Sequence, residues 1–190
     1  MKKIISLLLV ACICISAFAM LAACDEETDK EENVDPATVT EAGWRKAMEK
    51  EKFYNVKLEY SDCRYNKNSG EIDKYGPSVI EYDGDLRRGD GSDVKENSGD
   101  MDSAEIYEMV SMGLDHYKDA TYDEETKQYT VMVHNEDYNM NFGLVYKFEK
   151  GALIHCEWHF LFETDTLADM YKTQWFVMDF SNYGAVKLSK

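Results

Sequence analysis

The chain has 190 residues, with 37 acidic against 21 basic side chains and a formal net charge of −16 at pH 7. A chain this acidic is repelled by phosphate backbones, so nucleic acid is excluded as an expected partner. We find no nucleophile elbow, phosphate loop or cysteine–histidine motif, and paired carboxylates discriminate nothing in so acidic a chain. We therefore expect a protein that is not an enzyme and that holds no cofactor.

The N-terminus has the layout of a secretory signal. Two lysines, Lys2 and Lys3, precede an uncharged apolar run at residues 4–19, and the segment closes with Leu21-Ala22-Ala23-Cys24. The run is about long enough for a transmembrane anchor, which is the alternative interpretation. The small residues before the cysteine and the lack of a stop-transfer segment after it favour a cleaved signal.

Leu21-Ala22-Ala23-Cys24 resembles the lipobox of bacterial lipoproteins. The resemblance implies cleavage after residue 23 and attachment of diacylglycerol to Cys24, with further acylation such as palmitate. Two or more acyl chains hold a protein stably at a membrane, where one chain is marginal. The expected location is the extracytoplasmic face of the cell membrane. Removal of Lys2 and Lys3 with the signal takes the formal charge from −16 to −18.

The chain after the signal divides into a tether and a domain. Residues 24–37 are mostly charged and cannot bury enough surface to order themselves, which predicts an acidic flexible tether. Residues 38–190 are long enough for one core, and we expect a single domain there. It keeps two cysteines, Cys63 and Cys156, which could pair outside the cytoplasm or stay as buried thiols.

Hydrophobic periodicity predicts two helices and a largely antiparallel sheet. The first helix opens with a capping box at Thr38 and Glu41, and the second is capped by Asp102 or Ser103. A change of apolar parity in the first strand predicts a bulge near Ser61-Asp62. The expected elements are a helix at 38–53, strands at 54–65, 78–82 and 86–88, a helix at 102–117, and strands at 122, 129–134, 138–148, 154–163 and 173–180.

This order predicts an α+β fold, in which a curved antiparallel, half-barrel-like sheet has one apolar face covered by two helices. Two short motifs, Thr40-Glu41-x-x-Trp44 at the first helix and Asp-Phe-Ser-Asn-Tyr-Gly at 179–184, resemble small bacterial lipoproteins of the LolA/LppX half-barrel type. In that family the sheet wraps around helices, and acyl chains enter the cavity between them. This chain is shorter than the larger members and has fewer helices.

One face of the expected sheet is unusually aromatic. Such a face could line a cavity for an apolar ligand, with methionine as the adaptable filler, or it could be the core against which the helices pack. The candidate ligand-lining residues are Tyr138, Met140, Phe142, Tyr146, Trp158, Phe160 and Phe162.

His155, Glu157 and His159 alternate along one strand and therefore share a face. Two imidazoles and a carboxylate are suitable zinc ligands. Alternate residues of a strand are nearly 7 Å apart, however, so convergence on one ion would need strong curvature. We predict no metal site, with these three residues as the candidate ligands, and expect a solvated polar face.

Together these patterns predict a lipid-anchored extracytoplasmic protein that binds a lipid or another apolar ligand without catalysis. The alternative function, from a different class, is a protein-interaction module with a filled core that docks to a surface or envelope partner. The two functions differ in whether the fold leaves a cavity beside the aromatic face.

Overall fold

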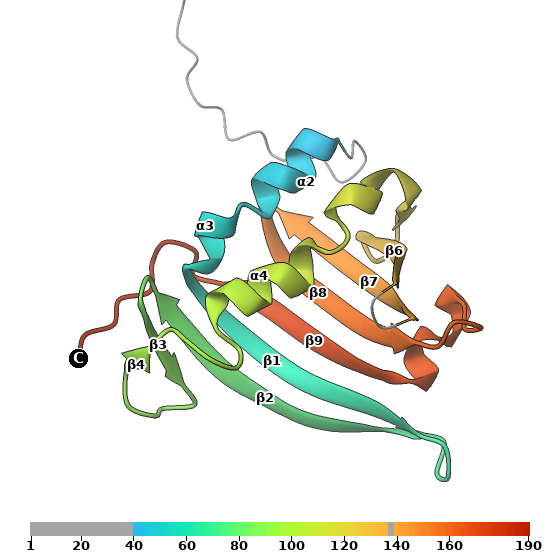
Figure 1. Ribbon diagram of the computed structural model, residues 1–190, viewed down its shortest axis with the longest axis horizontal. Coiled ribbons are helices and arrows are strands. Elements are labelled where there is room, and N and C mark those ends of the chain that lie inside the picture. Colours follow the sequence, from blue (N-terminus) through green and yellow to red (C-terminus); the bar gives the residue numbers. More distant parts are fainter. Residues whose placement is uncertain (1–39, 137–138) are drawn as a thin grey trace, which may run out of the picture. The chain divides into compact units, whose positions relative to one another are not determined.

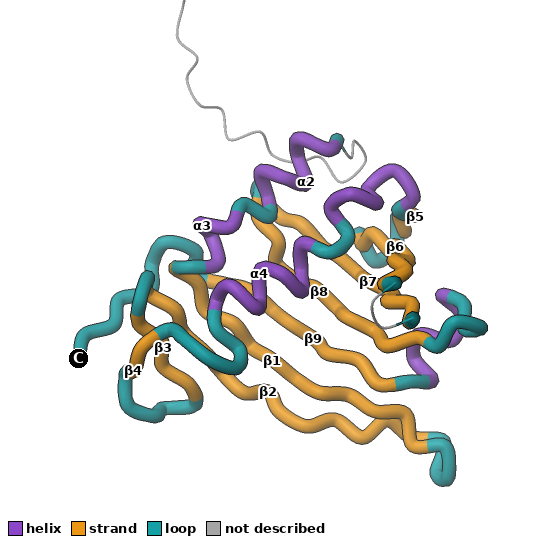
Figure 2. Tube along the Cα trace, in the orientation of Figure 1, coloured by secondary structure: helices purple, strands orange, loops and turns teal. Residues whose placement is uncertain are grey.

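The computed structural model describes residues 40–136 and 139–190, which belong to one compact unit. An open antiparallel sheet carries helices over one of its faces (Figures 1 and 2). The elements are α2 (Glu41–Ala47), α3 (Lys50–Phe53), β1 (Asn55–Asn66), β2 (Glu71–Asp83), β3 (Leu86–Gly89), β4 (Lys95–Glu96), α4 (Ser103–Ser111), the 3-10 helix η1 (Leu114–Asp119), β5 (Thr121–Asp123), β6 (Gln128–Asn135), β7 (Met140–Glu149), β8 (Ala152–Leu161), the 3-10 helix η2 (Leu167–Lys172) and β9 (Gln174–Ser181).

The sheet consists of two meanders joined by the last strand. Its order is β4-β3-β2-β1-β9-β8-β7-β6-β5, and the neighbours pair antiparallel. The predicted antiparallel sheet is therefore confirmed. β9 pairs with β1 on one side, where Leu58 lies opposite Phe180, and with β8 on the other, where Cys156 lies opposite Met178. The C-terminal strand thus occupies the middle of the sheet.

The first hairpin contains the predicted bulge, because the pairing of β1 with β2 shifts register between Tyr60 and Asp62. β2 is much longer than the strand expected at 78–82. Its first half, residues 71–77, is exposed on both faces and so carries no alternating pattern. Backbone pairing with β1, from Asn66 opposite Glu71 onward, forms this part of the strand instead.

The helical layer differs from the expected two helices. The first predicted helix is split into α2 and α3, and its N-cap is Thr40, whose hydroxyl accepts the N–H of Gly43 at 3.0 Å; Thr38 lies outside the described residues. α4 begins after Asp102 as predicted but ends at Ser111. Within the described residues, the short helices α2, α3 and α4 and the 3-10 helix η1, rather than two helices, therefore lie over the sheet (Figure 1).

The main core lies between this helical layer and the sheet. Trp44 of α2 is fully buried and packs edge-on against Tyr129 and Tyr146, with ring centroids 5.6 and 5.2 Å apart. α4 contributes Ile106 and Val110 to the same cluster. Aromatic pairs in such geometry add to the free energy gained from burial.

Tyr146 also explains where α4 stops. Its hydroxyl donates to the carbonyl of Val110 at 2.8 Å and accepts the N–H of Gly113 at 3.2 Å. A Cβ atom on Gly113 would lie 2.6 Å from this hydroxyl oxygen, so only glycine allows the approach. The periodic stripe that predicted a helix to residue 117 continues past this contact as η1.

The opposite face of the sheet carries a second, smaller cluster. Val145 and Leu161 are buried there under η2, against Met170 and Leu167. A face that the sequence pattern predicted to be solvated is thus partly covered by the connection between β8 and β9.

Candidate functional site

A groove of about 630 Å³ opens at the rim of the sheet, where β1 ends, β7 begins and β8 runs into η2. This volume lies within the ~300–1,000 Å³ that is typical of small-molecule sites. Apolar side chains make up much of its lining. Its walls are formed by Arg64, Tyr65, Lys67, Met140, Phe160, Phe162, Asp165, Asp169, Lys172, Thr173 and Gln174.

The structure divides the predicted ligand-lining residues between this groove and the core. Met140, Phe160 and Phe162 line the groove, and Phe162 is 66% exposed. Phe142 and Tyr146 are buried in the main core. Tyr138 lies outside the described residues. Among the described residues, the predicted aromatic face thus belongs to the core beneath the helices and lines the groove near the rim.

Trp158 connects the groove to the core. Its ring stacks on Phe142 with centroids 4.8 Å apart and planes 7° from parallel, and Phe160 meets it edge-on at 4.9 Å. Phe176 of β9 continues the aromatic row at 6.0 Å from Trp158. Among the described residues, the buried indole nitrogen of Trp158 has no hydrogen-bond partner. Trp158 itself does not line the groove, and it is joined to the groove lining through its contact with Phe160.

The charges around the groove are mostly satisfied within the protein. Arg64 donates to Asp62, and Lys172 donates to Asp169, which also accepts the backbone N–H of Thr166. Lys67 has neither a hydrogen bond nor an ion pair to any described side chain. The groove therefore offers an apolar floor with one uncommitted cation at its mouth.

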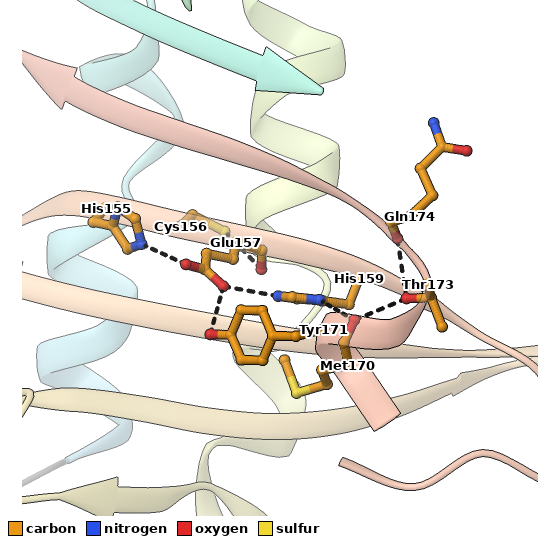
Figure 3. A network of polar contacts seen from close by, with 8 residues as sticks. All are labelled: His155, Cys156, Glu157, His159, Met170, Tyr171, Thr173 and Gln174. Carbon is orange, nitrogen blue, oxygen red and sulfur yellow. Dashed lines mark hydrogen bonds and ion pairs between the residues drawn. The ribbon is translucent and has the colours of Figure 1, made fainter. Parts of the chain in front are cut away.

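On the opposite face, the three candidate metal ligands form a chain of hydrogen bonds (Figure 3). Glu157 lies between two imidazoles, with Nε2 of His159 at 2.8 Å and Nε2 of His155 at 3.4 Å. Tyr171 donates its hydroxyl to the same carboxylate at 2.9 Å. Nδ1 of His155 lies 2.6 Å from Asp179.

His159 is the most enclosed member of this network. It is fully buried, stacks on Trp175 with planes 10° from parallel, and places Nδ1 2.9 Å from the carbonyl oxygen of Met170. The expectation of a solvated polar face is therefore wrong at this position. Alternation along β8 placed the residue on the correct face, but η2 and Trp175 cover it.

The network shifts the pKa values of its members. Burial alone would raise the pKa of Glu157, but hydrogen bonds from His155, His159 and Tyr171 outweigh burial and lower that pKa to about 2. Burial alone would lower the pKa of His155, yet its bonds to Glu157 and Asp179 raise it. The arrangement stabilises an ionised carboxylate between imidazoles.

These side chains satisfy one another rather than converge on an ion. Within the described ranges, no group of three or more His, Cys, Asp or Glu side chains is arranged to hold a metal. Each nitrogen of His155 and of His159 already faces an acceptor of the protein. The contacts made by His155, Glu157 and His159 are those of an internal polar network.

The two cysteines of the domain are free and buried. Cys63 lies opposite Trp175, and Cys156 lies opposite Met178, three residues further along β9. Because side chains alternate between the faces of a sheet, the two thiols lie on opposite faces. The open question of their pairing is answered by this geometry, which keeps them apart.

The chain matches no family model, and no curated protein matches its sequence. None of the helices in the described ranges is long and apolar enough to span a membrane. Cys24 and the segments predicted to be a signal and an acidic tether lie outside the described residues.

The sequence interpretation missed several residues of the site. Tyr171, Trp175 and Asp179 complete the network around Glu157, and Lys172 and Thr173 line the groove. The expected elements leave residues 164–172 unassigned, between the strands at 154–163 and 173–180. The Thr166–Asp169 capping box, visible in the sequence, was the signal that could have placed an ordered turn there.

Proposed function

We propose that this protein is a lipid-anchored, extracytoplasmic lipoprotein that binds a lipid or another apolar ligand and performs no catalysis. Ligand binding is supported by the groove of about 630 Å³, whose apolar lining comes from Met140, Phe160 and Phe162. Its size suits one small apolar or amphiphilic molecule. Transfer of an acyl chain from water to such a surface contributes about 0.8 kcal/mol per buried methylene group.

The proposal includes the resemblance to half-barrel lipoproteins. An open antiparallel sheet with helices over one face supports it. The ligand position that we propose differs from the arrangement that the resemblance implies. Tyr146, Leu144 and Cys156 fill the space under α4, so the ligand lies at the rim beyond the helices instead of between helices and sheet.

The anchor in this proposal is Cys24. The small residues before it, the charged n-region and the uncharged apolar run support lipidation at this position. The charged segment at 24–37 would then act as a tether that keeps the domain clear of the membrane surface. Because the chain is strongly acidic, acyl chains rather than charge would hold it there.

Ligand binding can be tested with one groove variant and one matched control. Phe162→Ala removes an exposed aromatic ring of the groove, and Ile72→Ala removes an exposed apolar side chain of β2 outside the lining. Neither change opens a core cavity. Titration with an uncharged apolar fluorophore should show weaker binding for Phe162→Ala and unchanged binding for Ile72→Ala. Equal affinity of the wild type and Phe162→Ala would reject the groove as the ligand site.

The alternative function, a protein-interaction module, is favoured by a different observation. The first half of β2 is exposed, and Ile72 and Tyr75 present large apolar surfaces to solvent there. The core under the helices is filled, as this function requires. Native mass spectrometry of protein made in cells distinguishes the two, because only a ligand carrier should retain a co-purifying apolar molecule.

A further inference from the structure

One wall of the groove is formed by a segment outside the sheet. Asp169 and Lys172 of η2 and the following Thr173 all line the groove. η2 precedes β9 and takes no part in the strand pairing. The position of this wall therefore depends on contacts that η2 makes with side chains of the sheet.

The strongest of these contacts converge on Met170 and Tyr171 (Figure 3). Nδ1 of His159 and the hydroxyl of Thr173 each lie 2.9 Å from the carbonyl oxygen of Met170. The hydroxyl of Tyr171 donates to Oε2 of Glu157, the same oxygen that faces Nε2 of His159. Two neighbouring residues of η2 are thus bound to one His–Glu pair, in which His159 is fully buried.

These contacts lie on the far face of the sheet from the groove floor. Glu157 and His159 alternate with Trp158 and Phe160 along β8, and Phe160 lines the groove. η2 therefore passes around the rim, with Asp169 and Lys172 toward the groove and Met170 toward the opposite face. The network holds the wall without touching the space that a ligand would occupy.

The imidazole of His159 lies between two acceptors of this attachment. The carbonyl of Met170 and the carboxylate of Glu157 are both acceptors, so His159 satisfies both only when each ring nitrogen carries hydrogen. A neutral ring must give up one of the two bonds. The other polar groups that face this pair are His155 on β8, Asp179 on β9, Tyr171 on η2 and Cys63 on β1.

We infer that His159, Glu157 and Tyr171 are positioning residues of the groove, which latch η2 to the far face and thereby set the affinity for the apolar ligand. This inference rests on the proposed function. It predicts that the affinity depends on the hydrogen bonds of these three residues, although none of them lines the groove.

Three variants separate positioning from general stability. Tyr171→Phe removes one latch bond from a half-exposed side chain, and Glu157→Gln removes the charge at nearly constant volume. His155→Gln is the matched control, because His155 bonds to the same Glu157 but not to η2. Amide hydrogen exchange of residues 167–174 should accelerate in the first two variants and stay as in the wild type in the control.

Ligand affinity is measured with N-phenyl-1-naphthylamine, an uncharged apolar fluorophore. Loss of one such bond should raise the Kd about three- to tenfold in Tyr171→Phe, with little change in His155→Gln. If the wild type binds the probe and Tyr171→Phe and Glu157→Gln bind it with the same Kd, the inference is wrong and the proposed function stands. A wild type that does not bind the probe contradicts the proposed function and removes the inference with it.

Discussion

Met170 packs directly over Gly143, where a Cβ atom would stand 3.0 Å from Cγ of the methionine. Gly143 lies opposite His159 in the pairing of β7 with β8. Because Gly143 has no side chain, Met170 of η2 can pack against the sheet at this point. A glycine in the middle of a strand usually costs stability, and here the close approach of a neighbouring side chain explains its presence.

Gly143→Ala should therefore displace Met170 and loosen η2. Because methionine is flexible and the overlap is a few tenths of an ångström, we expect a loss of about 1 kcal/mol in the free energy of unfolding. Chemical denaturation measures it. The double variant Gly143→Ala/Met170→Ala should lose less unfolding free energy than the sum of the losses in the two single variants. Strict additivity of these losses would contradict the contact.

Tyr146→Phe tests the contact that ends α4. The substitution keeps the ring but leaves the N–H of Gly113 and the carbonyl of Val110 without their partner inside the core. We expect a loss of about 1–3 kcal/mol in the free energy of unfolding, since buried groups are left unsatisfied. Tyr54→Phe, at a partly exposed position, is the control for losing a tyrosine hydroxyl. Equal stability of the two variants would argue against the buried bonds.

The His–Glu network predicts a window of pH in which it stabilises the fold. Glu157 has its pKa lowered to about 2, so its contribution is present above its ordinary value near 4.5 and is lost as the pH falls toward 2. His155 has a raised pKa, so its contribution is present below 6.5 and is lost as the pH rises through the raised value. Both contributions are complete between about pH 4.5 and 6.5.

This window can be tested by measuring the unfolding free energy of the wild type and of Glu157→Gln at a series of pH values. The difference in unfolding free energy should be largest inside it and shrink on both sides, with a carboxylate contribution on the order of 2–3 kcal/mol at its maximum. A difference in unfolding free energy that does not change with pH would contradict a contribution from the charge of Glu157.

Cys24→Ser tests the anchor. Without the thiol no thioether to diacylglycerol can form, so we expect an unprocessed precursor or release of the protein from the membrane fraction. Fractionation and intact-mass measurement distinguish these results. The neighbouring change Thr28→Ser, which leaves the lipobox intact, should not alter processing. Processed Cys24→Ser protein that remained with the membrane would contradict lipidation at this residue.

The sequence pattern predicted elements well where one face is buried. The alternation from Tyr54 to Tyr60 located β1 and its bulge, and Asp102 located the start of α4. It failed where the burial is not periodic. The exposed half of β2 owes its form to pairing with β1, and the break between α2 and α3 has no marker as strong as proline or glycine.

For the site, periodicity placed Phe160 and His159 on opposite faces but could not say what covers either of them. His159 is enclosed by Trp175 and the backbone of Met170, from strands and turns that are distant in sequence or irregular. One wall of the groove comes from η2, whose contacts with His159 and Glu157 local sequence does not reveal.

The central place of β9 has a consequence for the order of events during synthesis. The strand that joins the two meanders follows all the other described strands in the chain, so the edges of β1 and β8 cannot pair with it until those strands have been made. Each meander alone is half a sheet with an open edge. The sheet can therefore close only after β9 has been made, and until then the edges of β1 and β8 remain open to other strands.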